Sequence, residues 1–356
     1  MIHPDFERLK IRLREKNRSH PQPVSAMVEL TYGCNLRCVH CYNPTHEAKG
    51  EKTTTEVLKI LDELAAQGCL RVGFTGGELF TRRDALEILW HARRKGFLFN
   101  ILTNATLVTP SLADQLQALD PLQVEISIYG ATAGTYEKFT GVPGSFAKFV
   151  RGVDLLIERK VPVLVKIVLI SLNIHELDLM WDFASRRHVR CIVSTTLQPK
   201  ANGSKEPLAY RVTPEQAFEV WRRFSGEGTR RNLQLKGGPA FGEDCGSAGR
   251  LFNCACGKTS LAVSPYGKMN LCVSMQYPEI DLSKRTVGEA WNQLVEMVAS
   301  TQPGASYECG ECRLAALCPR GTHHGWLEQG DFSSGCIPHY RQIAEQKAAF
   351  LNEKET

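Results

Sequence analysis

The sequence of 356 residues lacks the features that would place it in a membrane or an export pathway. Its first 18 residues are charged and contain no apolar segment of the signal-peptide type. Its most apolar stretch, residues 161–170, is too short to span a bilayer and contains Lys166. Internal repeats and low-complexity tracts are also missing. These absences exclude a membrane-spanning or fibrous chain and predict a cytoplasmic protein.

Charge of one sign is scarce as well. The chain has 43 basic and 38 acidic residues, for a net charge of +5, and the charges are scattered. Such a surface is too weakly basic for a nucleic-acid footprint, so we expect neither nucleic acid nor a membrane as a partner. The basic group at residues 10–18 is typical of the solvated face of a helix, and we expect an N-terminal helical extension over residues 1–25.

Cysteine is the residue that the sequence has in excess, with thirteen in all. Reducing compartments disfavour disulfides, so clustered cysteines predict metal ligands. Three lie between positions 34 and 41 and eight between 245 and 336, which predicts two metal-binding regions. Cys69 and Cys191 stand alone and are expected to be ordinary buried thiols.

Short β-rich segments alternate with helical patterns from residue 26 to 196, which predicts βα units around a parallel sheet. Strands are expected at residues 26–31, 70–74, 97–102, 122–128, 161–170 and 190–195. Apolar periodicity predicts helices near residues 57–64, 85–95, 110–119, 145–160, 174–187 and 214–224. The expected fold class is α/β, a partial (β/α)6 TIM-like barrel with a C-terminal Cys-rich domain.

We expect the barrel at residues 26–200, a linker with one helix at 201–244, the Cys-rich domain at 245–340 and a C-terminal helix at 341–356. The last third shows little periodicity before that helix, so metal sites rather than a large apolar core are expected to hold it together.

Cys34, Cys38 and Cys41 follow the first expected strand directly. They therefore lie on a loop at the carboxyl end of a barrel strand, where such folds place their chemistry. Three thiolates at this spacing ligate three irons of a 4Fe-4S cubane and leave the fourth iron open to a non-protein ligand. A tetrahedral zinc site completed by His40 is the alternative.

A Thr-Gly-Gly-Glu segment, residues 75–78, follows the second expected strand. Together with the Cys-x3-Cys-x2-Cys motif it resembles the signature of the radical S-adenosylmethionine (SAM) superfamily. The resemblance implies reductive cleavage of SAM by the 4Fe-4S cluster to a 5'-deoxyadenosyl radical that abstracts hydrogen from a substrate. It also implies that Gly76, Gly77 and Glu78 contact the methionine part of SAM, because glycine lets the backbone approach closely.

The same resemblance implies further SAM contacts at the ends of the following strands, by Asn104, Ser127 and Lys166, with His40 beside the adenine. Three of the four have a plainer interpretation: Asn104 as a turn cap, Lys166 as an inward ion-pair partner and His40 as a packing residue. The sequence identifies no catalytic acid or base.

The C-terminal cysteines resemble the SPASM domain, a module that carries auxiliary iron-sulfur clusters. The second half of the domain is matched by the four-thiolate set Cys309, Cys312, Cys318 and Cys336. The first half is matched by Gly267-x4-Cys272 with Cys254 and Cys256. The resemblance implies one or two auxiliary clusters, with electron transfer as the role of the four-thiolate set. A rubredoxin-like or zinc-ribbon site is the alternative.

The first auxiliary site departs from the family pattern. The family commonly has a further cysteine three or four residues after Cys318, where this chain has Gly321 and Thr322. We therefore predict that the first auxiliary cluster is held by Cys254, Cys256 and Cys272, with Cys245 completing the set or leaving one iron open. In the plainer interpretation Cys245 is a free thiol and Cys256 a packing residue.

Residues 127–156 resemble a subgroup that modifies ribosomally synthesised peptides, which implies an oxidised peptide or protein substrate. Only about 25 residues precede the first strand, so a separate peptide-recognition protein or a leader-independent mode is expected. An external donor such as flavodoxin or ferredoxin would supply electrons. The alternatives are a small-molecule enzyme acting on a tetrapyrrole side chain or an aminocyclitol, and a non-enzymatic iron-sulfur carrier.

Overall fold

The computed structural model of the chain describes residues 21–355 apart from 225–250, 253, 332 and 334. The expected helix at residues 10–18 and Cys245 lie outside the described residues. All six expected strands are present, and neighbouring strands pair in parallel in the order β6-β5-β4-β3-β2-β1. Their bounds are β1 Ser25–Glu29, β2 Arg71–Thr75, β3 Leu98–Thr103, β4 Gln123–Ile128, β5 Val163–Val168 and β6 Arg190–Ser194.

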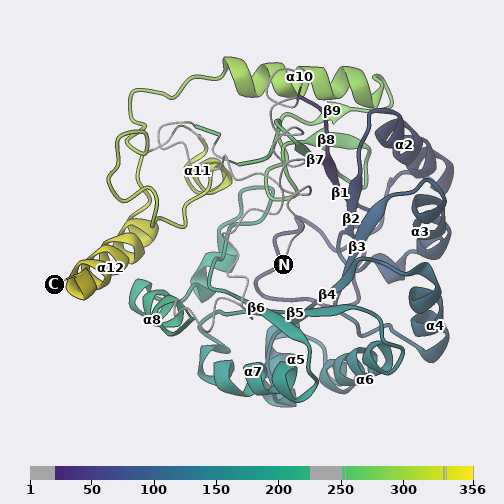
Figure 1. Cartoon of the computed structure of the whole chain (residues 1–356), viewed down its shortest axis with the longest axis horizontal. Helices are drawn as coiled ribbons and strands as arrows, with labels where there is room; N and C mark the ends of the chain where they lie inside the picture. The colour runs from purple at the N-terminus through teal and green to yellow at the C-terminus, as the bar shows by residue number, and fades with distance from the viewer. Residues whose placement is uncertain (1–20, 225–250, 253, 332, 334, 356) are drawn as a thin grey trace.

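These strands form an arc whose outer side is covered by helices, and the expected partial barrel is confirmed (Figure 1). The covering helices are α2 Thr54–Ala66, α3 Ala85–Arg94, α4 Pro110–Leu119, α5 Ala133–Thr140, α6 Ser145–Glu158 and α7 Leu177–Arg186. Their N-termini are set by local signals: Thr53 and Glu56, for example, form a capping box before α2. Single 3-10 turns lie at η1 Leu79–Thr81, η2 Ile174–Glu176 and η3 Glu206–Tyr210.

The sheet continues into the Cys-rich part of the chain. Strand β7, Ser260–Val263, pairs in parallel with β1, and β8, Lys268–Asn270, and β9, Ile280–Asp281, follow in antiparallel pairing. The described strands therefore make one nine-stranded sheet. The C-terminal third is joined to the barrel by a backbone ladder and not only by side chains.

The last third was expected to show little helical periodicity before its C-terminal helix, and this expectation is wrong. A fourteen-residue helix, α10 Val287–Ser300, lies in that region. Its buried face is formed by Val287, Ala290, Trp291 and Leu294, which belong to the main apolar core. These positions have the spacing i, i+3, i+4 and i+7 of an amphipathic helix, so the periodic signal was present in the sequence. Apolar packing thus contributes to holding this region together.

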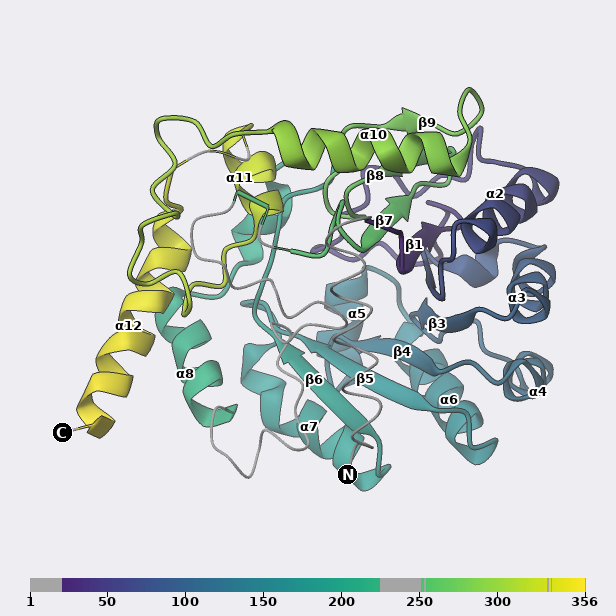
Figure 2. The ribbon, with the colours of Figure 1, turned by 45° about the horizontal axis from the view of Figure 1, so that its top comes forward.

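The remaining helices close the open side of the arc. Helices α8, Pro214–Phe224, and α12, Pro338–Glu355, lie side by side, while α11, Thr322–Gln329, faces the concave side of the sheet (Figures 1 and 2). A buried ion pair of 2.6 Å between Arg211 and Glu328 connects the segment before α8 to α11. No helix in the described part of the chain is long and apolar enough to cross a membrane.

Candidate functional site

A cavity of about 610 Å³ lies at the carboxyl ends of the barrel strands. Its lining comes mainly from the cysteine loop after β1, the glycine segment after β2, the ends of β3 to β6 with residues 196–198, and residues 273–274, 319–321 and 323–324 of the C-terminal region. Cys34, Cys38 and Cys41 all line this one cavity, together with Gly76 and Gly77. The tertiary structure therefore brings the two sequence motifs to a single site.

The three thiols of the loop are partly buried, and the positive charges of Arg37 near Cys34 and Lys200 near Cys41 offset the cost of ionising them only in part. Burial raises the pKa of Cys34 to about 11 and raises the pKa values of Cys38 and Cys41, and electrostatic repulsion among the three adds to this. Thiols in such a place become ligands once a metal centre supplies positive charge. The donor set therefore fits an iron-sulfur cluster.

The three thiols do not surround one point. Among the described residues, no group of three or more His, Cys, Asp or Glu side chains is arranged to hold a metal ion. Three thiolates that each bind a different iron of a cubane do not share a single ion, so this spread is compatible with the predicted cluster.

The glycine segment packs directly on the loop that leads into Cys34. Gly76 has φ of +139°, and a Cβ on it would collide with the carbonyl oxygen of Thr31. A Cβ on Gly77 would collide with the carbonyl oxygen of Gly33, while the Gly77 N–H donates to the Thr31 carbonyl at 2.7 Å. Only glycine allows this approach of two backbone segments.

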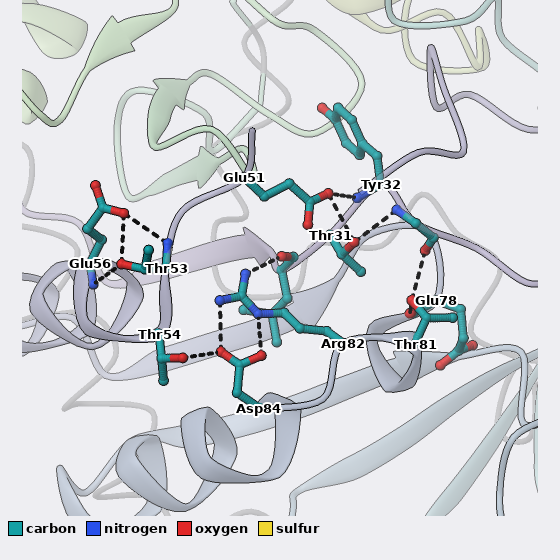
Figure 3. Close-up of polar contacts among 12 residues, drawn as sticks. Thr31, Tyr32, Glu51, Thr53, Thr54, Glu56, Glu78, Thr81, Arg82 and Asp84 are labelled. Carbon is teal, nitrogen blue, oxygen red and sulfur yellow. Dashed lines mark hydrogen bonds and ion pairs between the residues drawn. The ribbon is translucent and has the colours of Figure 1, made fainter. Parts of the chain in front are cut away.

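Polar side chains brace the same loop from behind, as Figure 3 shows. The Thr31 hydroxyl accepts from the Gly33 N–H at 2.9 Å and donates to Glu51 at 3.0 Å. The Arg82 guanidinium donates to the Leu30 carbonyl at 2.8 Å and makes two bonds to Asp84, at 2.8 and 2.9 Å. The cysteine loop thus enters the site from a fixed backbone.

Glu78 lies behind the cavity wall and is not among its lining residues. Its carboxylate accepts from the Thr103 hydroxyl at 2.9 Å, the Asn104 N–H at 2.7 Å and the Phe80 N–H at 3.1 Å. Burial raises the pKa of Glu78 to about 7, and these hydrogen bonds oppose the rise. Here Glu78 ties the glycine segment to the end of β3, and its expected contact with SAM stays a prediction.

Asn104 lines the cavity and connects two loops. Its amide donates to Asn35 Oδ1 at 3.0 Å, and its Oδ1 accepts from the Thr106 N–H at 2.9 Å. Asn35 donates in turn to the Thr106 hydroxyl at 2.7 Å. The cysteine loop and the loop after β3 are therefore cross-linked beside the cavity.

Ser127, Lys166 and His40 also line the cavity. Ser127 and Lys166 are register partners on β4 and β5, and the Lys166 ammonium forms a 2.8 Å ion pair with Glu125. Of the two interpretations of Lys166 that the sequence allowed, the structure shows the inward ion pair. The His40 ring packs edge-on against the stacked rings of Tyr129 and Phe139, at 5.0 and 4.7 Å, and burial lowers the pKa of His40 to about 4.

The C-terminal cysteines gather in two groups. The thiol of Cys256 is within hydrogen-bonding reach of both Cys254 and Cys272. Cys318 and Cys336 interact electrostatically with each other and with Cys309, and Cys336 interacts with Cys312. The two groups contain the same cysteines as the two predicted auxiliary sets, except for Cys245, which lies outside the described residues. At the position of the missing family cysteine, the Thr322 hydroxyl donates to the Leu251 carbonyl at 2.6 Å.

Sequence reasoning missed two histidines, His323 and His324, which line the cavity from the start of α11. Glu125 and Arg320 were also missed. An available signal was the His-His pair five residues after Cys318, but only the packing of α11 against the barrel shows that it reaches the cavity.

A comparison with family models matches residues 28–184 to the Radical SAM superfamily. This part of the chain is therefore a radical SAM domain, and members of that superfamily use a 4Fe-4S cluster and SAM. The matched segment contains the three cysteines of the loop and the glycine segment.

Two curated relatives match different shares of the chain. The AdoMet-dependent heme synthase of Methanosarcina barkeri is 34% identical over 58% of this chain and 59% of its own length. The mycofactocin maturase MftC of Mycobacterium tuberculosis is 27% identical over 87% of this chain and 80% of its own. The chain thus spans about three fifths of the heme synthase and most of the maturase.

Solved structures share the fold over nearly the whole chain. Streptococcus suis SuiB bound to its precursor peptide SuiA has a TM-score of 0.71 at 14% identity and covers 96% of this chain and 82% of SuiB. The enzyme anSMEcpe with bound AdoMet and a peptide has a TM-score of 0.67 at 16% identity, with 93% and 98% covered.

Proposed function

We propose that this chain is a radical SAM enzyme that oxidatively modifies a ribosomally synthesised peptide or protein. The observation that carries the proposal is the single cavity lined by Cys34, Cys38, Cys41, Gly76 and Gly77. When bound there, the cluster and SAM would supply a 5'-deoxyadenosyl radical that abstracts hydrogen from the substrate.

The chain's own residues would hold and orient the reactants. The three cysteines would ligate three irons, and the backbone of Gly76 and Gly77 would approach the methionine part of SAM. Asn104 and Ser127 present polar groups to the same cavity. The wall from residues 319–324 would limit access of water to the reacting carbon.

Peptide modification is supported by the alignment with mycofactocin maturase, which extends over 87% of this chain. The second candidate is oxidation of a tetrapyrrole side chain, favoured by the higher identity of 34% to the heme synthase, although over only 58% of the chain. The whole-chain alignment includes the Cys-rich region, so we place the peptide first.

The proposal includes the two auxiliary cysteine sets, because loss of an electron from a substrate radical needs an acceptor. The four-thiolate set of Cys309, Cys312, Cys318 and Cys336 would serve as that acceptor. We also propose that the protein is cytoplasmic, that a flavodoxin or ferredoxin reduces it, and that a separate protein recognises the peptide. The domain division proposed is that of the sequence analysis, with the barrel at residues 26–200, the linker at 201–244 and the Cys-rich domain at 245–340.

The direct test is anaerobic incubation of the reconstituted enzyme with SAM and a reductant. We expect release of 5'-deoxyadenosine by wild type and less than about 1% of that rate in Cys38→Ala, because a three-ligand cluster loses an essential ligand. Cys69→Ala is the matched control, since Cys69 is a buried thiol outside the cavity. Full cleavage by Cys38→Ala would contradict the assignment.

Substrate class is tested in the same reactions by adding the peptides encoded beside the gene. Mass spectrometry should show a peptide that has lost two hydrogens. Conversion of an added tetrapyrrole instead, with every peptide mass unchanged, would replace the peptide with the second candidate.

A further inference from the structure

Helix α11 presents its first turn to the cavity from a firmly held position. The Thr322 hydroxyl bonds the Leu251 carbonyl at 2.6 Å, and Glu328 at the other end forms the buried ion pair with Arg211. Figure 1 shows the helix facing the concave side of the barrel arc. Side chains at the start of α11 therefore have a fixed orientation toward the site.

His324 is the buried member of the histidine pair, with 1% of its surface exposed. Its Nδ1 accepts a hydrogen bond from the Gly321 N–H at 2.8 Å, so the ring is neutral and its proton is on Nε2. The ring packs against Tyr340 at 4.6 Å and against His323 at 3.9 Å. His324 thus acts as a fixed support for its neighbour.

His323 is the member that is open to the cavity. It is partly exposed, lines the cavity, and makes no hydrogen bond to any residue that the structure describes. Burial, with the positive charge of Arg320 nearby, lowers the pKa of His323 to about 4. A neutral imidazole carries one N–H donor and one acceptor, so His323 offers an uncommitted donor to a bound molecule.

The charges of the lining favour an anionic partner for this donor. Apart from the cysteine thiols, Glu125 is the one acidic side chain among the described lining residues, and it is paired with Lys166. Arg320 adds a positive charge on the same wall as His323, although its guanidinium also contacts Cys309 Sγ at 3.3 Å. The described residues of this wall therefore include no carboxylate that would repel an anion.

We propose that His323 is a substrate-contact residue that donates its ring N–H to a carboxylate of the substrate. This inference rests on the proposed function, since it places the substrate in the cavity that holds SAM. The carboxylate could belong to an acidic side chain or the C-terminus of a peptide, or to a propionate of a tetrapyrrole. Both sources share the same chemistry and are separated by the test.

The test measures binding to the reconstituted enzyme with SAM present, by anaerobic titration calorimetry. One arm uses the peptide encoded beside the gene, as the free acid and with its carboxylates amidated. The other uses coproporphyrin III and its uncharged amide. Wild type, His323→Leu and His323→Asn are compared, with His175→Leu as control, because His175 is 64% exposed and lies outside the cavity.

We expect wild type and His175→Leu to bind the acid form of one probe at least about tenfold more tightly than its amide, as a hydrogen bond to a charged group would give. His323→Leu should lose most of this preference, and His323→Asn, which keeps a donor, should recover part of it. The arm that shows the preference identifies the source of the carboxylate.

The proposal is overturned if wild type shows no preference for either acid form, or if His323→Leu keeps the full preference. It is also overturned if His323→Leu loses iron, since the ring would then be a cluster ligand. Release of 5'-deoxyadenosine without substrate is measured in every variant. If wild type releases no 5'-deoxyadenosine, the result counts against the proposed function. If His323→Leu releases it at the normal rate and still prefers the acid form as wild type does, the result counts against the role of His323 alone.

Discussion

At the scale of single residues, Glu29 shows how the cysteine loop is supported at a cost in stability. Glu29 is 2% exposed at the end of β1 and accepts hydrogen bonds from the Tyr42 hydroxyl at 3.0 Å and the Tyr32 hydroxyl at 3.3 Å. Burial raises the pKa of Glu29 from 4.5 to about 8, and the two hydrogen bonds only partly oppose this. The folded state therefore holds this proton to a higher pH than the unfolded state does.

Stability from Glu29 is fully present below pH 4.5 and declines as pH rises toward 8, because the unfolded chain loses the proton first. We expect Glu29→Gln, which cannot ionise, to exceed wild type in free energy of unfolding at pH 8 by roughly 2–4 kcal/mol. Near pH 5 the two proteins should differ by less than about 1 kcal/mol.

Thermal unfolding of anaerobic samples at several pH values measures this difference. Glu87→Gln is the control, since Glu87 is exposed on α3 and its substitution should leave the pH profile unchanged. If the profiles of Glu29→Gln and wild type run parallel from pH 5 to 8, Glu29 is ionised in the folded protein and the prediction is wrong.

At the scale of structural elements, the segment from Cys254 to Cys272 is the part of the Cys-rich region that departs from the family pattern. The Cys256 thiol lies within hydrogen-bonding reach of both Cys254 and Cys272, while the Thr322 hydroxyl bonds the Leu251 carbonyl. A hydroxyl here holds α11 to the segment before Cys254, where the family's cysteine would reach the cluster.

We expect Cys256→Ala to lower iron content by about four atoms per chain, the content of one cubane, and to remove the matching Mössbauer component. Cys191→Ala is the control, because Cys191 is buried in β6 away from the cavity. Cys245→Ala should give the same loss if Cys245 completes the set and no loss if one iron is open. If Cys256→Ala keeps the iron content of wild type, Cys256 is a packing residue and not a cluster ligand.

At the scale of the whole molecule, the barrel and the Cys-rich region share one sheet and one apolar core. Strand β1 has β2 on one side and β7 on the other, and Trp291 of α10 is buried in the main core and donates to the Pro21 carbonyl at 2.8 Å. Removing the C-terminal third would expose both the edge of β1 and this apolar surface.

A chain truncated after residue 224 is therefore expected to aggregate, with less than about a tenth of the full-length protein recovered as monomer, because an unpaired inner strand promotes association. Size-exclusion chromatography of the two proteins under the same anaerobic conditions checks this. A truncated chain that elutes as a monomer and keeps its helical circular dichroism would mean that the barrel folds without β7.

Local sequence patterns determined the six barrel strands, most of their helices and the cysteine spacings, because side-chain periodicity and ligand spacing act over a few residues. Helix α10 has the same kind of local signal, since Val287, Ala290, Trp291 and Leu294 recur at helical spacing, although the sequence analysis did not predict this helix. The buried state of Cys69 and Cys191 was also predictable and is confirmed.

Only the tertiary structure decided which groups share the cavity. It placed Glu78 behind the wall, paired Lys166 with Glu125, set β7 beside β1 and brought His323 to the cavity that the cysteine loop lines. Such contacts join residues far apart in the chain, and they depend on how whole elements pack to bury apolar surface. No local pattern encodes that packing, so the sequence by itself determined the chemistry available at this site, whereas the fold determined its geometry.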